Sequence, residues 1–132
     1  MSDNYGDMPA TIAAWHRVVE SKDPVELDAL LADECVFRSP AVHTPQEGKG
    51  LTTTYLTAAM VVLGPTLTYR REWYADDSAV LQFSAELDGL SIDGIDMITW
   101  GADGKITEFA VMVRPVKALN KVMELMAAEL FK

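Results

Sequence analysis

Three turn signals in the second half of the chain constrain the fold more than any other feature of the sequence. Each lies between runs rich in Val, Ile, Thr, Phe, Tyr and Trp; they are Asp76-Asp77, Asp88-Gly89 and Ala102-Asp103-Gly104. Short polar turns between β-branched and aromatic runs are typical of β-hairpins. The pattern therefore predicts an antiparallel meander with strands near 66–75, 78–87, 90–100 and 105–114.

The remaining segments show helical spacing. Apolar residues recur every three or four positions in four segments. These are Ile12 to Val19, the residues after a possible helix cap at Asp23-Pro24, residues 51–63, and residues 116 to the C-terminus. A short strand over 35–40 and a loop over 41–50 separate the second and third helices. Helices followed by a meander indicate an α+β fold, with helices covering one face of an antiparallel sheet. If the sheet curls around the helices, a pocket opens between them.

Length and charge limit the classes of partner. The chain has 132 residues and a net charge of −9, from 11 basic and 20 acidic side chains. This length fits a single domain over 1–132. A negative surface repels phosphate backbones and anionic lipids, so we expect neither nucleic acid nor membrane as a partner. The one cysteine, Cys35, and an N-terminus without a signal-peptide pattern predict a cytoplasmic protein.

Asp96 is the side chain that most needs an explanation. Strand alternation places it on the same face as Ile92, Ile98 and Trp100. Burial on an apolar face would raise the pKa of the carboxyl, so that at neutral pH it could stay protonated and donate a hydrogen bond. That is the chemistry of a general acid or an oxyanion donor. The alternative is that this face is wet, or that a nearby hydroxyl or backbone amide satisfies Asp96.

Other candidates are weaker. His43 follows a strand and could act as a base, or it could be an exposed loop histidine. We expect Trp15 in the core, where a ligand could accept its N–H. Ser39 lacks the Gly-x-Ser-x-Gly turn of a nucleophile and is expected to end a strand. His16 lies beside the first apolar stripe and is interpreted as structural or exposed.

The sequence predicts neither a metal site nor a cofactor. The two histidines lie far apart, the single thiol has no companion, and no phosphate-binding glycine motif occurs. In the strand near 66–75, Arg70, Arg71 and Glu72 stand among aromatic residues. We expect this charged strand to face solvent or a dimer partner.

The chain resembles the nuclear transport factor 2-like superfamily in the order of its elements and in the segment IDMITWGADGKITEF. Within that superfamily it resembles the branch of ketosteroid isomerases and SnoaL-like polyketide cyclases. The resemblance spans nearly the whole chain and includes the phrase LLADECVFRSP and the D-x(6)-D-G-K ending. It implies a cone-shaped α+β fold, in which a curved antiparallel sheet packs against N-terminal helices and a C-terminal helix follows. It also implies a homodimer.

The resemblance assigns roles to three positions. Asp96 corresponds to the oxyanion-hole aspartate of ketosteroid isomerase, because the number of residues from each aspartate to the following Gly-Lys pair, here Gly104-Lys105, is the same. The aspartate of that enzyme is a known case of a carboxyl kept neutral by an apolar site. The catalytic base of that enzyme lies in an Asp-Pro pair, which here reads Ser39-Pro40. Its helix-one tyrosine corresponds to Trp15. The isomerase mechanism therefore does not carry over unchanged.

Two functions stay open. The first is binding of a hydrophobic small molecule with a carbonyl or hydroxyl, with cofactor-free isomerisation, cyclisation or dehydration by proton transfer if the protein is an enzyme. Asp96 as acid and His43 as base would then be catalytic, and the ligand-binding residues would be Trp15, Ser39, Tyr55, Phe109 and Val111. The second is a non-catalytic ligand-binding or dimerisation module, in which Asp96 makes a structural hydrogen bond.

Overall fold

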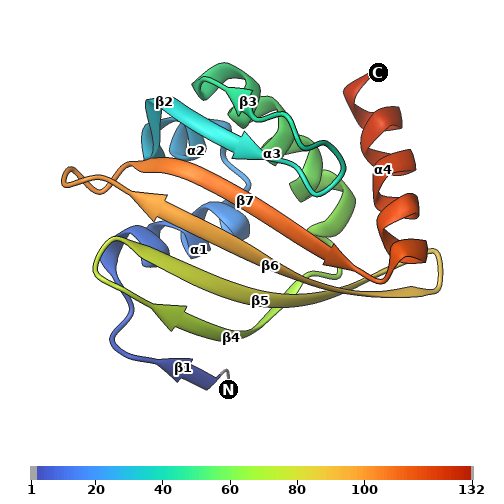
Figure 1. Cartoon of the computed structure of the whole chain (residues 1–132), viewed down its shortest axis with the longest axis horizontal. Helices are drawn as coiled ribbons and strands as arrows, with labels where there is room; N and C mark the ends of the chain where they lie inside the picture. The colour runs from blue at the N-terminus through green and yellow to red at the C-terminus, as the bar shows by residue number, and fades with distance from the viewer. Residues whose placement is uncertain (1–2, 132) are drawn as a thin grey trace.

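The computed structural model describes residues 3–131, within which the chain forms four helices and seven strands (Figure 1). The helices are α1 (Ala10–Ser21), α2 (Pro24–Leu30), α3 (Lys49–Leu63) and α4 (Val116–Leu130). The strands are β1 (Asp3–Tyr5), β2 (Leu31–Arg38), β3 (Gln46–Glu47), β4 (Thr68–Tyr74), β5 (Ser78–Leu87), β6 (Leu90–Trp100) and β7 (Ile106–Arg114).

All seven strands belong to one sheet, in the order β1-β4-β5-β6-β7-β2-β3. Strands β4 to β7 form the antiparallel meander that the turn signals predict. At its two edges β1 runs parallel to β4 and β2 runs parallel to β7, which makes the whole sheet mixed rather than purely antiparallel. The predicted α+β class and its C-terminal helix are confirmed.

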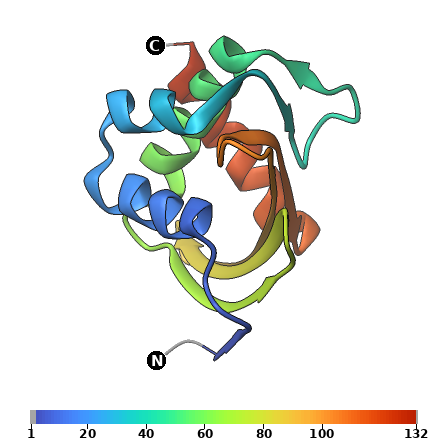
Figure 2. The ribbon, with the colours of Figure 1, turned by 90° about the vertical axis from the view of Figure 1, so that its left-hand side faces the viewer.

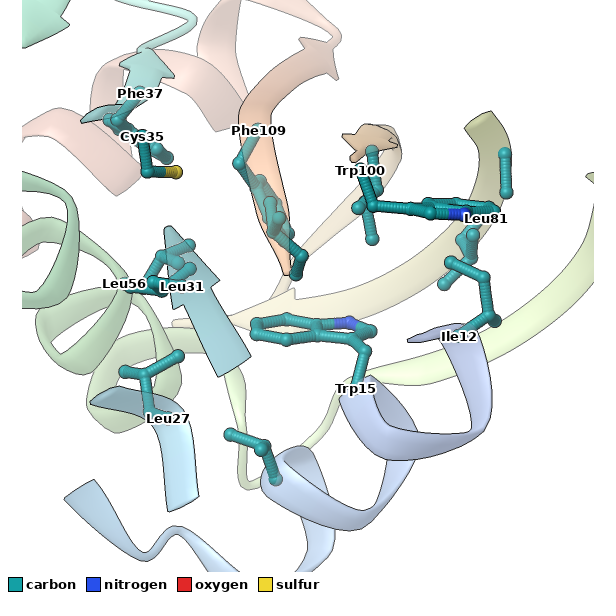
Figure 3. Close-up of a cluster of buried hydrophobic side chains, with 14 residues drawn as sticks. Ile12, Trp15, Leu27, Leu31, Cys35, Phe37, Leu56, Leu81, Trp100 and Phe109 are labelled. Carbon is teal, nitrogen blue, oxygen red and sulfur yellow. The ribbon is translucent and has the colours of Figure 1, made fainter. Parts of the chain in front are cut away.

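The sheet curves around α1 and α3, which lie on its concave side (Figure 2). In the main core, α1 contributes Ile12 and Trp15, which pack with buried residues of the sheet such as Leu81 and Phe109 (Figure 3). A second cluster joins Val122 of α4 to buried residues of α3, β5 and β6. The curved sheet packed against the N-terminal helices is therefore as predicted.

The N-terminal half departs from the prediction in the bounds of three strands. β2 begins at Leu31, ahead of the short strand predicted over 35–40, and the backbone of Leu31 is already extended (φ −92°, ψ 137°). Strand β3 falls in the loop predicted over 41–50, and β1 falls in a segment for which no strand is predicted. Both lie at sheet edges and are very short, so pairing with a partner strand determines them more than local sequence does.

A β-bulge in β4 decides which of its side chains face the helices. Tyr69 pairs with Phe83 and Glu72 pairs with Leu81, so three steps along β4 match two along β5. The extra residue inverts the alternation beyond it. Tyr69 and Glu72 therefore share the inner face, and Glu72 is only 2% exposed. The expectation that this charged strand faces outward is wrong for Glu72.

Candidate functional site

A pocket lies between the helices and the concave face of the sheet. Side chains of α1, α3 and strands β4 to β7 line it, and its volume is about 50 Å³. Among the described residues that form this wall, the polar side-chain groups are the indole N–H of Trp15, the hydroxyl of Tyr69 and the carboxyl of Asp96. The wall is otherwise apolar. A few polar groups converging in an apolar concavity are typical of small-molecule sites.

Asp96 projects into this pocket from the middle of β6. It pairs with Leu81 on one side and Val111 on the other, and it is 6% exposed. Burial raises the pKa of its carboxyl from an ordinary 3.8 to about 7, although the hydrogen bond from Tyr69 and the charge of His16 both act to lower it. Protonated and ionised forms of Asp96 therefore coexist near neutral pH.

Tyr69 connects Asp96 to helix α1. Its hydroxyl donates to Asp96 Oδ2 at 2.6 Å and accepts from Trp15 Nε1–H at 2.9 Å. Burial and the neighbouring Asp96 raise the pKa of Tyr69 well above its ordinary value, so the phenol keeps its proton. The acceptor for the Trp15 indole N–H is thus the Tyr69 hydroxyl, whereas the sequence also allowed a bound ligand as acceptor.

The structure brings together some of the predicted site residues. Asp96, Trp15, Phe109 and Val111 all line the pocket. The rings of Trp15 and Phe109 meet edge to face, with centroids 4.8 Å apart. These four side chains come from α1, β6 and β7, which the sheet topology places around one space.

The other three predicted residues lie outside this lining. His43 is exposed in the loop between β2 and β3. Ser39 Oγ accepts from the backbone N–H of Ala41 at 3.0 Å, which is a local turn contact. Tyr55 stacks on Phe37 at a centroid distance of 5.5 Å. The geometry therefore gives these residues no contact with Asp96.

Sequence reasoning missed a second polar cluster on the inner face of β4. His16 Nε2 lies 2.7 Å from Glu72 Oε2, and Tyr74 donates to Glu72 Oε1 at 2.8 Å. Burial alone would raise the pKa of Glu72, but the contacts with His16 and Tyr74 lower it below its ordinary value. Tyr69 and Glu72 were missed because the bulge breaks the alternation from which inward-facing positions are read.

Residues 3–131 contain neither a cluster of metal ligands nor a helix suited to span a membrane. No three His, Cys, Asp or Glu side chains in this range lie close enough to hold a metal ion. No helix there has the length and apolar character needed to cross a membrane.

A family model described as a SnoaL-like domain matches residues 12–109, which is most of the chain. The chain belongs to the SnoaL-like family. Comparison of this SnoaL-like protein with curated protein sequences finds no match.

Solved structures place the SnoaL-like chain among NTF2-like folds, as the sequence resemblance implies. A steroid delta-isomerase from Pseudomonas aeruginosa is 36% identical, with a TM-score of 0.87 over 92% of this chain and 89% of that one. An uncharacterised protein with a cystatin-like fold from Silicibacter pomeroyi is 29% identical, with a TM-score of 0.85 over 92% and 85%. An NTF2-like protein from Mesorhizobium loti is 22% identical, with a TM-score of 0.69 over 86% of this chain and 99% of that one. At this identity the likeness shows the fold alone.

Proposed function

We propose that the pocket binds a hydrophobic small molecule carrying a carbonyl or hydroxyl, and that Asp96 is the group that recognises and protonates it. The observation that carries this proposal is a carboxyl in an apolar wall, fixed by the Tyr69 hydroxyl at 2.6 Å and with a pKa raised to about 7. A carboxylic acid held neutral in this way can donate to a carbonyl oxygen as negative charge develops there. The similarity to a steroid delta-isomerase supports a reaction of this class.

The proposed reaction is cofactor-independent proton transfer: isomerisation, cyclisation or dehydration. The Oδ2 atom of Asp96 is occupied by Tyr69, so the other carboxyl oxygen is the one that would meet the ligand. Tyr69 in turn is held by Trp15, which fixes the phenol and so the carboxyl. These two hydrogen bonds hold the carboxyl of Asp96 in its orientation before the ligand binds, so little reorganisation is needed during the reaction.

A non-catalytic binding protein is the second candidate, and one observation favours it. Among the described residues that line the pocket, Asp96 and Tyr69 are the ones with titratable side chains. Tyr69 keeps its proton, so the ionised fraction of Asp96 is the one proton acceptor in this wall. Enzymes of this chemistry generally need a base as well as an acid. His43 as base would require the loop over 41–45 to approach the pocket.

Pocket size sets the expected ligand. Sites that bury drug-sized ligands enclose roughly 300–1,000 Å³, whereas this pocket measures about 50 Å³. The pocket therefore favours a compact ketone over a large one. A larger ligand would require the α3 side chains to move, and Met60 in that wall is flexible enough to do so.

We also propose a homodimer that packs through the outer face of the sheet. Trp73, Val80 and Met97 lie in one cross-strand row on that face. Trp73 and Met97 are each 39% exposed, and Met112 on β7 is 55% exposed. Contiguous exposed apolar side chains mark interaction surfaces, and one patch on each of two copies satisfies two-fold symmetry.

A binding titration tests the ligand proposal. Cyclohexanone, acetophenone and a steroid ketone would be titrated by calorimetry into the wild-type protein, Asp96→Asn and Asp93→Asn. Asp93 lies on the same strand but is exposed, so it is the matched control. We expect at least one ketone to bind the wild type and the control equally, and Asp96→Asn to bind about tenfold more weakly or worse. Equal affinity in all three proteins would remove Asp96 from the site.

A further inference from the structure

The cluster around Glu72 has no part in the proposed chemistry and needs a reason of its own. Glu72 is a carboxylate on the inner face of β4 with 2% exposure, as buried as the apolar core. A buried charge without a partner is strongly destabilising. Its two partners are Tyr74, which donates to Oε1, and His16, whose Nε2 lies 2.7 Å from Oε2.

His16 occupies a boundary position between this cluster and the pocket. Its side chain is 28% exposed, so it can exchange protons with solvent while Glu72 holds its inner edge. Its ring also meets the ring of Tyr69 edge to face, with centroids 5.0 Å apart and planes at 89°. Tyr69 is the residue that donates to Asp96.

One short stretch of α1 therefore touches the Asp96 site twice. Trp15 supplies the N–H that fixes Tyr69, and the next residue, His16, stands against the Tyr69 ring as a group that can carry positive charge. That charge favours the ionised form of Asp96, in opposition to burial. An imidazole is the side chain that ordinarily changes charge within the neutral range.

We propose that His16 is a positioning residue for the Asp96 site: held by Glu72 against Tyr69, its charge sets how much of the acid form of Asp96 is present at a given pH. The inference deepens the proposed function and depends on it for its catalytic meaning. It predicts that the availability of the acid is controlled from outside the pocket, by a partly exposed imidazole.

The groups that face His16 come from two strands. From β4, Glu72 and Tyr69 contact His16 directly, and Tyr74 reaches it through Glu72; from β6, Asp96 reaches it through Tyr69. On α1 itself the next charged side chain, Arg17, is exposed. Arg17 thus offers a matched cation at the neighbouring position that points away from the cluster.

The test follows the Asp96 carboxyl by carbon-detected NMR from acid to mildly alkaline pH, without any ligand. The proteins compared are the wild type, His16→Gln and Arg17→Gln. Glutamine keeps an N–H for Glu72 and removes the titratable charge. We expect the Asp96 midpoint to rise by about half a pH unit or more in His16→Gln and to stay unchanged in Arg17→Gln. An unchanged midpoint in both variants would overturn the proposal.

A second measurement covers the case in which His16→Gln does not fold. In the wild type, coupled groups titrate together, so the Asp96 carboxyl signal should show a second inflection at the pH at which the His16 ring titrates. A single inflection unrelated to His16 would overturn the inference. Because no ligand is used, failure of the ketone titration would count against the proposed function and leave this result standing.

Discussion

The Tyr69 hydroxyl donates to Asp96 Oδ2 at 2.6 Å, and this contact joins two strands that are not neighbours in the sheet, β4 and β6. The same hydroxyl accepts from Trp15 on α1. A single oxygen therefore links helix α1 to the acid in the pocket, and removing it should disturb both Trp15 and Asp96.

Tyr69→Phe tests this connection. The hydrogen bond from Tyr69 lowers the pKa of Asp96, so its loss should move that pKa above about 7. The indole N–H of Trp15 also loses its acceptor, and a buried unsatisfied donor costs about 1–3 kcal/mol of unfolding free energy. Carbon-detected NMR and urea denaturation measure the two effects. Tyr55→Phe, whose ring stacks on Phe37, is the control and should change neither.

The stability of the protein should depend on pH through Asp96. Its pKa is about 7 in the folded state against an ordinary 3.8, so between about pH 4 and 7 the folded protein holds a proton that the unfolded chain has released. The free energy of unfolding therefore falls as the pH rises through this window, by an amount on the order of 4 kcal/mol, and levels off above it.

Asp96→Asn should remove this slope, whereas the exposed Asp93→Asn should keep it. Glu72 does not interfere, because its lowered pKa gives stability that is present above its ordinary value of 4.5 and is lost only at more acidic pH. Urea denaturation at several pH values measures the slope. A wild-type slope as flat as that of Asp96→Asn would mean that the carboxyl is solvated.

How far the sequence predicts this site depends on the regularity of each strand. Asp96 lies in β6, which pairs residue by residue with β5, so period-two alternation places it correctly on the inner face. Tyr69 and Glu72 lie on either side of a bulge, where alternation fails. The contact between His16 and Glu72 joins residues 56 positions apart in the numbering and has no local signal.

Filling the pocket should abolish binding without unfolding the protein. Ala59 on α3 lines the pocket, and Ala59→Leu would place a branched side chain in a space of about 50 Å³. Leucine is a good helix former, so α3 should persist. Calorimetry should show loss of ketone binding with a melting temperature near that of the wild type. The exposed Val61→Leu, on the same helix, should bind normally; binding retained by Ala59→Leu would place the ligand elsewhere.

The dimer proposal predicts a sedimentation mass of twice 14.5 kDa at micromolar concentration. Met97→Lys puts a charge in the outer apolar row and should reduce the mass to 14.5 kDa. Met123→Lys on α4 makes the same charge change at the same 39% exposure and should leave the dimer intact. A wild-type mass of 14.5 kDa would show that this face has no partner of its own kind.

The extra residue in β4 has an evolutionary consequence. On a regular strand Tyr69 and Glu72, three positions apart, would face opposite sides of the sheet; deleting one of Arg70 and Arg71 would leave them two positions apart and still on one face. Glu72 would then stay on the inner face, and only the bulge and one exposed arginine would be lost. In a scaffold of this kind, a bulge lets a strand gain or lose one residue while the polar lining of the interior is kept.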